Sequence, residues 1–467
     1  LLVCVAGSHL IFGSTPVSYD EVMAEFDRRI FQTGHLAALV APEYRPLLPG
    51  LVRTFWLDIP GHAAWVSSYW PGNAALRALA GSSIGAIWTG PVLAAVTLLA
   101  TADVAQTLFK GDRTRRATAL LLLALSPQFL LMAMTPYAMS AHLALNMIWL
   151  ALFLRDRPFP HLAAIAISIL ATGLHQLVFH PLFAAPFLLW RLREGRIRLV
   201  LIYGLAFALI LLAWMQYPAY LRSAYGFTVI TGSAPQGTVI AGGFLEFITR
   251  WTGILGGGEN SVSGHAAFTP LTFFNITRFV VWQSPLLVPL LVAGLFHLRG
   301  ERPVIIAMTA GVGLTLLFMV LVLPYQGRGW GYRYMLATGL GAVVILPASA
   351  VLAAHFTAPI ARGMALIHAA PADYVVIDEN GLPFSSDLVR NDPDLKNRPL
   401  MVHLAALPRD LVSQLCAAGK RVMVFDRRSG TAIGFLATEG GAEIADPTPT
   451  ENRRALEAAC APERLMP

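Results

Sequence analysis

Two adjacent carboxylates stand at the start of a short amphipathic segment near the beginning of the chain. Ser18, Asp20 and Glu21 precede apolar residues that recur every four positions, which predicts a helix over 18–31 lying along a membrane surface. Those apolar residues are Val22, Phe26 and Ile30. Ser18 and Glu21 have the spacing of a capping box, which accounts for Glu21 without a catalytic role. Asp20 is not needed for that box, so this pair is the candidate catalytic site, with Asp20 suited to accept a proton from a substrate hydroxyl.

Polar side chains further along the same stretch are weaker candidates. His35, Arg53, His62 and Tyr69 are placed to line a substrate pocket, although each of them alone is more typical of a surface residue. The sequence has no Walker loop, no GxGxxG after a strand, no GxSxG, no HExxH and no CxxC. The function must therefore be read from polar residues outside the apolar runs.

The composition predicts a membrane protein. Of the 467 residues, 56% are apolar and 13% are charged, and the mean hydropathy is +0.60. Soluble domains carry about 25% charged residues. These values exclude a disordered chain, a disulfide-rich secreted domain and an ordinary cytosolic enzyme. The net charge of +7 is typical of basic cytoplasmic loops in membrane proteins, so we expect no nucleic-acid partner.

About ten apolar runs are long enough for spans or for short buried helices. We therefore expect an all-α polytopic membrane protein with about 10 or more transmembrane helices in residues 1–372. The first run is interpreted as the truncated outer end of a span. The runs are 1–13, 84–109, 117–132, 138–154, 161–176, 178–190, 199–216, 279–298, 303–324 and 335–355.

The loops between these runs predict the orientation. Four short loops are rich in Lys and Arg, which the positive-inside rule places in the cytoplasm. The long segments 14–82 and 217–278 then lie outside, where a loop of that length is usually functional. We expect a multi-pass integral protein of a bacterial inner membrane. The basic loops contain Lys110, Arg113, Arg115 and Arg116; Arg155 and Arg157; Arg191, Arg193, Arg196 and Arg198; and Arg299 and Arg302.

Residues 373–467 are predicted to be a small soluble α/β domain. They hold 11 Lys/Arg and 14 Asp/Glu, whereas the rest of the chain holds 23 and 13. The buried strands expected at 374–378, 400–405 and 421–426, with a helix over 407–418, favour a parallel sheet. Counting spans places this tail in the cytoplasm, and one more span within 350–370 would place it outside. Only outside would Cys416 and Cys460 form a disulfide. The polar stretch SSDLVRNDPDL at 385–395 is interpreted as a turn rather than as an acceptor contact.

The order of these features resembles the GT-C superfamily of membrane glycosyltransferases, which includes protein O-mannosyltransferases and lipid A aminoarabinose transferases. An apolar run leads directly into the Asp-Glu pair, followed by a long outer segment with an amphipathic helix. Further similar features are the Pro-rich stretch Arg45 to Pro49, the run WVSSYWPG at 65–72, and the Gly-rich aromatic turn GRGWGYRY at 327–334. The resemblance covers roughly residues 1–355.

The resemblance implies transfer of a sugar from a polyprenyl-phosphate carrier to a lipid, glycan or protein acceptor of the cell envelope, in a mannosyltransferase-like displacement. It implies that Asp20 is the general base and that Arg333, or less favourably Arg328, binds the donor phosphate, since Arg binds phosphate in a bidentate manner. Trp330 and Tyr332 are candidates for stacking on the sugar, and the alternative is that they belong to an aromatic belt at the membrane interface. Many members carry a second acid where this chain has none and offers His142, so a divalent metal remains open and no other cofactor is implied.

Two other interpretations compete. A transporter or flippase of lipid-linked sugars should show internal repeats and charged groups near mid-membrane, and the sequence shows neither clearly. A non-catalytic subunit of an envelope polysaccharide assembly is the third interpretation. His142, His175 and His180 lie in or near apolar runs without acidic partners, which favours core hydrogen bonding over a ligand or proton-relay role.

Overall fold

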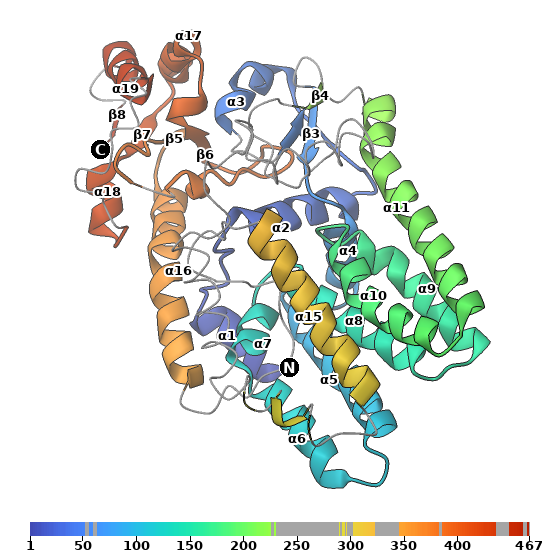
Figure 1. Ribbon diagram of the computed structural model, residues 1–467. Helices are drawn as coiled ribbons and strands as arrows, with labels where there is room; N and C mark the ends of the chain where they lie inside the picture. Colours follow the sequence, from blue (N-terminus) through green and yellow to red (C-terminus); the bar gives the residue numbers. More distant parts are fainter. Residues whose placement is uncertain are drawn as a thin grey trace. The chain divides into compact units, whose positions relative to one another are not determined.

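The computed structural model divides into two compact units that are interleaved along the chain (Figure 1). The helical unit comprises Leu1–Ser8, Tyr69–Tyr220 and Gln236–Val351, and the mixed unit comprises His9–Ser68, Leu221–Pro235 and Leu352–Pro467. The structure describes residues 1–51, 56–58, 63–225, 228–229, 289, 292–294, 296, 302–322, 345–382, 385–435, 448–460 and 465–466.

The helical unit consists of helices whose positions follow the apolar runs. Helix α5 packs on α8, α8 packs on α9, and α10 packs on α15. The helices are α1 (Leu2–Leu10), α4 (Gly72–Ile84), α5 (Thr89–Leu108), α6 (Arg113–Ala124), α7 (Pro127–Ala133), α8 (Met139–Phe153), α9 (Pro158–Thr172), α10 (Phe179–Arg193), α11 (Ile197–Tyr225) and α15 (Arg302–Val322), and the boundaries between the units fall within α1 and α11.

Two described helices are long and apolar enough to cross a membrane, Ala86–Leu108 and Ile197–Leu221. Helices α6 and α7 would together make a third, but they are bent by 56° at a break, where Ser126 caps α7 and Pro127 begins it. The apolar helices Met139–Phe153, Pro158–Thr172 and Pro303–Phe318 are shorter than the roughly 20 residues that a span needs. The described residues thus indicate membrane association. The expectation of about ten spans stays a prediction.

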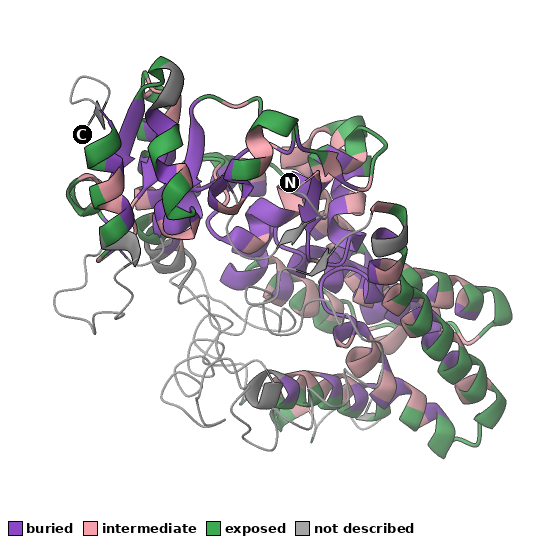
Figure 2. Ribbon diagram, turned by 90° about the horizontal axis from the view of Figure 1, so that it is seen from above, coloured by how far each residue is buried: buried purple, intermediate pink, exposed green. Residues whose placement is uncertain are grey.

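The surface of α11 fits this conclusion. Figure 2 shows long helices with exposed outer faces, and only 17% of the apolar window in Ile197–Leu221 is buried. An apolar surface of this extent is unfavourable in water and typical of contact with lipid. Its exposed large side chains include Ile197, Leu201, Ile202, Leu205, Leu209 and Leu212.

Close backbone contacts hold the shorter helices together. The backbone N–H of Gly72, at the start of α4, donates to the carbonyl of Gly173 at 2.9 Å. A Cβ at Gly72 would lie 2.5 Å from that carbonyl oxygen, and a Cβ at Gly90 in α5 would lie 2.3 Å from the carbonyl oxygen of Ala133. Only glycine permits these approaches.

The mixed unit contains two four-stranded sheets. One is antiparallel with the order β1-β3-β2-β4, and the other is parallel with the order β6-β5-β7-β8. The N-terminal elements are α2 (Tyr19–Gln32), β1 (Ala38–Leu39), η1 (Pro42–Leu47), α3 (Leu48–Leu51), β2 (Trp56–Asp58), β3 (Ala64–Ser67) and β4 (Thr228–Val229). The C-terminal elements are α16 (Ile345–Ala369, partly in the helical unit), β5 (Tyr374–Ile377), η5 (Ser385–Leu388), β6 (Leu400–His403), η6 (Leu404–Ala406), α17 (Arg409–Val412), η7 (Ser413–Gly419), β7 (Val422–Phe425), α18 (Arg427–Ala432), α19 (Thr448–Ala459) and β8 (Leu465–Met466).

The predicted parallel sheet is confirmed. Tyr374 of β5 pairs with Leu400 of β6 on one side and with Val422 of β7 on the other. The single helix expected over 407–418 is instead the short α17 followed by the 3-10 helix η7. A disulfide joins Cys416, in the middle of η7, to Cys460, the residue directly after α19.

The compact unit that contains this sheet differs from the predicted domain 373–467, because it also includes residues 9–68. The hydroxyl of Thr357 in α16 donates to the carbonyl of Ile11 at 2.9 Å. A Cβ at Gly50 would lie 2.9 Å from the side chain of Leu407 and 3.0 Å from that of Val402. Two segments that are far apart in sequence therefore share one core, which composition along the chain does not reveal.

Candidate functional site

The two predicted acids lie in the first turn of α2, and Glu21 completes the capping box expected there. Its Oε2 accepts hydrogen bonds from the backbone N–H groups of Val17 and Ser18, both at 2.8 Å. The side chain is fully buried, with 0% of its surface exposed. This geometry supports the structural interpretation of Glu21, and its assignment to the catalytic pair stays a prediction.

Burial also changes the acidity of Glu21. Loss of solvent raises the pKa of the Glu21 carboxyl to about 7, while the bonds from Ser18 and Val17 and the charge of Arg390 act in the opposite direction. Glu21 Oε1 is buried and has no hydrogen-bond partner among the described residues. Glu21 therefore titrates near neutral pH rather than near its ordinary value.

Asp20 lies in a different environment although it is the neighbouring residue. It is the second residue of α2 and is partly exposed, whereas Tyr19 and Glu21 on either side of it are buried. Its negative charge raises the pKa of Glu21. Of the two acids, Asp20 is thus the one that solvent can reach.

A segment from the C-terminal part of the chain holds the start of α2. We call residues 387–393 the brace segment. Arg390 donates from Nη1 to the carbonyl of Pro16 at 2.7 Å and from Nε to the carbonyl of Asp387 at 2.6 Å. The hydroxyl of Tyr19 donates to the carbonyl of Val389 at 3.2 Å. These bonds fix the residues on both sides of the helix N-cap.

The brace segment also contacts the rest of the N-terminal elements. Asn391 Nδ2 donates to the carbonyls of Leu51 at 2.9 Å and Met401 at 2.7 Å, and Trp65 Nε1 donates to the carbonyl of Pro393 at 2.7 Å. The stretch interpreted from sequence as a turn rather than as an acceptor contact is therefore a central contact segment of the mixed unit. Its density of Asp, Asn and Arg was visible in the sequence, but partners more than 300 residues away were not.

The apolar face of α2 packs on β3. The rings of Phe26 and Trp65 meet edge to face with centroids 5.0 Å apart. Next to them, buried Asp27 accepts hydrogen bonds from the backbone N–H of Ser67 at 3.0 Å and from the Ser67 hydroxyl. Burial raises the pKa of Asp27 to about 7, although both bonds from Ser67 act to lower it. The helix is confirmed, and its apolar face covers protein, while its expected position along a membrane surface stays a prediction.

Two of the other predicted site residues, His35 and Tyr69, lie within the described part of the chain. His35 is exposed just after α2. Tyr69 belongs to the helical unit, where its ring stacks on His175 with centroids 4.8 Å apart. Arg53, Arg328, Trp330, Tyr332 and Arg333 lie outside the described residues, as does most of 217–278.

Within the helical unit, a buried histidine joins three helices. His180 of α10 lies 2.7 Å from Asn146 Oδ1 of α8 through Nδ1 and 2.9 Å from Ser168 Oγ of α9 through Nε2. This is the core hydrogen bonding that was expected for His180. His142 is also buried, and neither of its ring nitrogens has a hydrogen-bond partner in the part of the chain that the structure describes.

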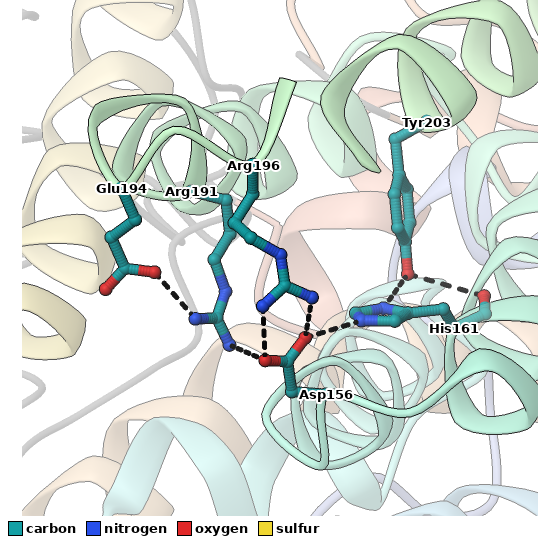
Figure 3. Close-up of polar contacts among 6 residues, drawn as sticks. All are labelled: Asp156, His161, Arg191, Glu194, Arg196 and Tyr203. Atoms are coloured by element: carbon teal, nitrogen blue, oxygen red, sulfur yellow. Dashed lines mark hydrogen bonds and ion pairs between the residues drawn. The ribbon is translucent and has the colours of Figure 1, made fainter. Parts of the chain in front are cut away.

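A cluster of ionic groups surrounds Asp156 in the turn between α8 and α9 (Figure 3). Arg196 makes two bonds to its carboxylate, at 2.9 and 3.0 Å, and His161 Nε2 lies 3.2 Å from Oδ1. Burial raises the pKa of Asp156, but the bond from His161 and the charges of Arg191 and Arg196 outweigh it and lower that pKa overall. The remaining contacts join Arg191 to Asp156 at 3.8 Å, Arg191 to Glu194 at 2.7 Å and His161 to Tyr203 at 3.0 Å.

The positive and negative charges of this cluster balance one another, which is typical of a structural ion-pair network that links two turns. The basic residues were expected in cytoplasmic loops, but their convergence on Asp156 was not expected. Among the described residues no group of three or more His, Cys, Asp or Glu side chains could hold a metal ion. No family model, curated protein or solved structure matches the chain.

Proposed function

We propose that this chain is a membrane glycosyltransferase of the GT-C type, which moves a sugar from a polyprenyl-phosphate carrier to an acceptor on the outer face of the membrane. Asp20 takes the proton of the acceptor hydroxyl as its oxygen attacks the anomeric carbon. The bond from the sugar to the lipid phosphate breaks, and the phosphate leaves with its negative charge stabilised by Arg333. The acceptor is a lipid, a glycan or a protein.

The observation that carries this proposal is the different environment of the two neighbouring acids. Glu21 is buried and bonded to the backbone, so it fixes the start of the helix. Asp20 is partly exposed on the same turn, ten residues after the end of α1 at Leu10. A general base must be held rigidly and yet be accessible to substrate, and this pair supplies both conditions.

We also propose that the chain crosses the membrane several times and that residues 373–467 lie on the outer side. Residues 14–68, part of the segment 14–82 that the positive-inside rule places outside, share a compact unit with 352–467. A bilayer cannot pass between segments that share a buried core. The disulfide between Cys416 and Cys460 supports this placement, because disulfides persist in oxidising compartments.

The proposal is tested by the substitution Asp20→Asn in membranes supplied with labelled polyprenyl-phosphate sugar. We expect transfer to fall by about 10²- to 10⁴-fold, since the amide cannot accept the proton. Glu25→Gln is the matched control, because Glu25 lies on the same helix and pairs with Arg28 at 2.7 Å. It should retain transfer. Full transfer by Asp20→Asn would exclude Asp20 as the base.

A transporter of lipid-linked sugars is the second candidate, and one observation favours it. His180, Asn146 and Ser168 are polar groups inside apolar helices, and such groups often mark a transport path. A reconstituted protein that moves labelled lipid-linked sugar across liposomes without an acceptor, equally well with Asp20→Asn, would establish this alternative. Sugar transfer without translocation would exclude it.

A further inference from the structure

Two buried charged side chains next to the proposed base have atoms that the protein leaves without hydrogen bonds. They are Glu21 Oε1 and Arg390 Nη2, and neither has a partner among the described residues. An unsatisfied buried charged atom is destabilising, so such atoms are retained where they serve another purpose. Both lie beside the first turn of α2, which also carries Asp20.

We propose that Arg390 is a positioning residue of the active site: it fixes the start of α2, and its positive charge offsets the negative charge that gathers at the Asp20–Glu21 pair, so that Asp20 acts as a base at neutral pH. This inference rests on the proposed function. It makes the C-terminal part of the chain a component of the catalytic site rather than a separate module.

The bonds of Arg390 support the first half of this proposal. Its guanidinium bridges the carbonyl of Pro16, just before α2, and the carbonyl of Asp387, in its own segment. Two donors in one plane fix direction as well as distance, which a lysine ammonium on a flexible chain does not. The first turn of α2 is therefore tied to the brace segment at the residues that determine where Asp20 points.

The charges around the acids support the second half. Two adjacent carboxylates repel each other, and Glu21 has in addition lost its solvent. The positive end of the α2 dipole and Arg390 oppose that effect. The charged groups that act on Glu21 are Asp20 and Arg390, and the titratable groups that act on Arg390 are Glu21 and Tyr19. Asp387 of the brace segment contacts Arg390 through its backbone carbonyl. Arg390 is the cation whose charge acts on Glu21 among the described residues.

The test compares Arg390→Gln with Arg390→Lys in the full-length protein. The amide nitrogen of glutamine falls where Nε of arginine lies, so glutamine keeps a donor for the Asp387 carbonyl but removes the charge and the bond to Pro16, whereas lysine keeps the charge. We expect the acid limb of the pH profile of kcat/KM to move up by roughly one pH unit in Arg390→Gln and to stay near the wild-type position in Arg390→Lys. Arg398→Gln is the matched control, since Arg398 bonds Tyr44 and Leu395 instead, and its profile should not move.

If Arg390→Gln lowers activity at every pH without moving the acid limb, Arg390 has only a structural role and the proposal is wrong. A second measurement separates this result from failure of the proposed function. The infrared carboxyl band that disappears in Glu21→Gln should titrate at higher pH in Arg390→Gln than in the wild type, whether or not sugar is transferred. An unchanged midpoint for this band would overturn the proposal.

Discussion

At the scale of single residues, Asp20 and Glu21 show how one turn of helix gives two neighbouring acids different properties. The N3 side chain of a capping box folds back toward the residues before the helix, and in this protein that space is filled by the brace segment. Glu21 is buried as a result, while Asp20 at N2 is partly exposed. The spacing predicted the box, but the burial depends on residues 387–393, which the local sequence cannot indicate.

Glu21 and Asp27 predict that stability falls as the pH rises. Each carboxyl has a pKa near 7 in the folded chain, above its ordinary value of 4.5 or 3.8. The folded state therefore favours the protonated form, and this contribution is fully present below about pH 4 and is lost as the pH rises through 7. The amide of Asp27→Asn can still bond Ser67 but does not titrate. This substitution should therefore reduce the pH-dependent change in the free energy of unfolding by on the order of 2–4 kcal/mol.

The measurement is the free energy of unfolding of the detergent-purified protein at pH 5 and pH 7.5. Wild type should lose more stability over this range than Asp27→Asn. Asp112→Asn is a control, because Asp112 lies in an exposed turn and caps α6. Equal losses in wild type and Asp27→Asn would show that Asp27 is already ionised in the folded chain at pH 5.

At the scale of elements, periodicity predicted which segments form helices and strands but not what they pack against. The helix expected over 18–31 is Tyr19–Gln32, and the strands expected near 374, 400 and 421 are present. The apolar stripe of α2, expected to meet lipid, packs on Trp65 instead. A stripe of this kind shows that a face is buried without showing the partner, because lipid and protein select the same apolar side chains.

The Asp156 cluster gives a prediction at this scale, because it joins the α8–α9 turn to the residues between α10 and α11. Asp156→Ala leaves Arg191 and Arg196 without their common carboxylate and should lower the free energy of unfolding by roughly 1–3 kcal/mol. Asp103→Ala breaks the exposed pair with Arg155 and should cost less than about 1 kcal/mol.

Denaturation at two pH values tests the sign of this effect. The pKa of Asp156 is lowered by folding, so its contribution is present above the ordinary Asp value and is lost as the pH falls through the lowered one. The difference between wild type and Asp156→Ala should thus be smaller at strongly acidic pH than at pH 7. If Asp156→Ala and Asp103→Ala lower the free energy of unfolding equally at pH 7, the cluster does not stabilise the connection between the two turns.

At the scale of the whole molecule, the mixed unit is assembled from parts of the chain that the sequence separates by hundreds of residues. Counting apolar runs placed the C-terminal residues in the cytoplasm. That placement changes if the number of spans changes by one, and hydropathy does not define where each span ends. The long helix α16 over Ile345–Ala369 falls in the range where one further span would reverse that placement. Shared burial with 9–68 is a stronger indication of sidedness than the count.

Labelling of single cysteines tests this sidedness in intact cells. His35→Cys and Lys396→Cys replace exposed residues from the two ends of the mixed unit, and Arg113→Cys replaces an exposed residue in a basic loop. A membrane-impermeant maleimide should label the first two without permeabilisation and the third only after it. The native Cys416 and Cys460 should not react unless they are first reduced, since they are paired. Labelling of Lys396→Cys only after permeabilisation, with His35→Cys labelled before it, would separate the two segments by a bilayer and exclude both the outer placement and a role for Arg390 beside Asp20.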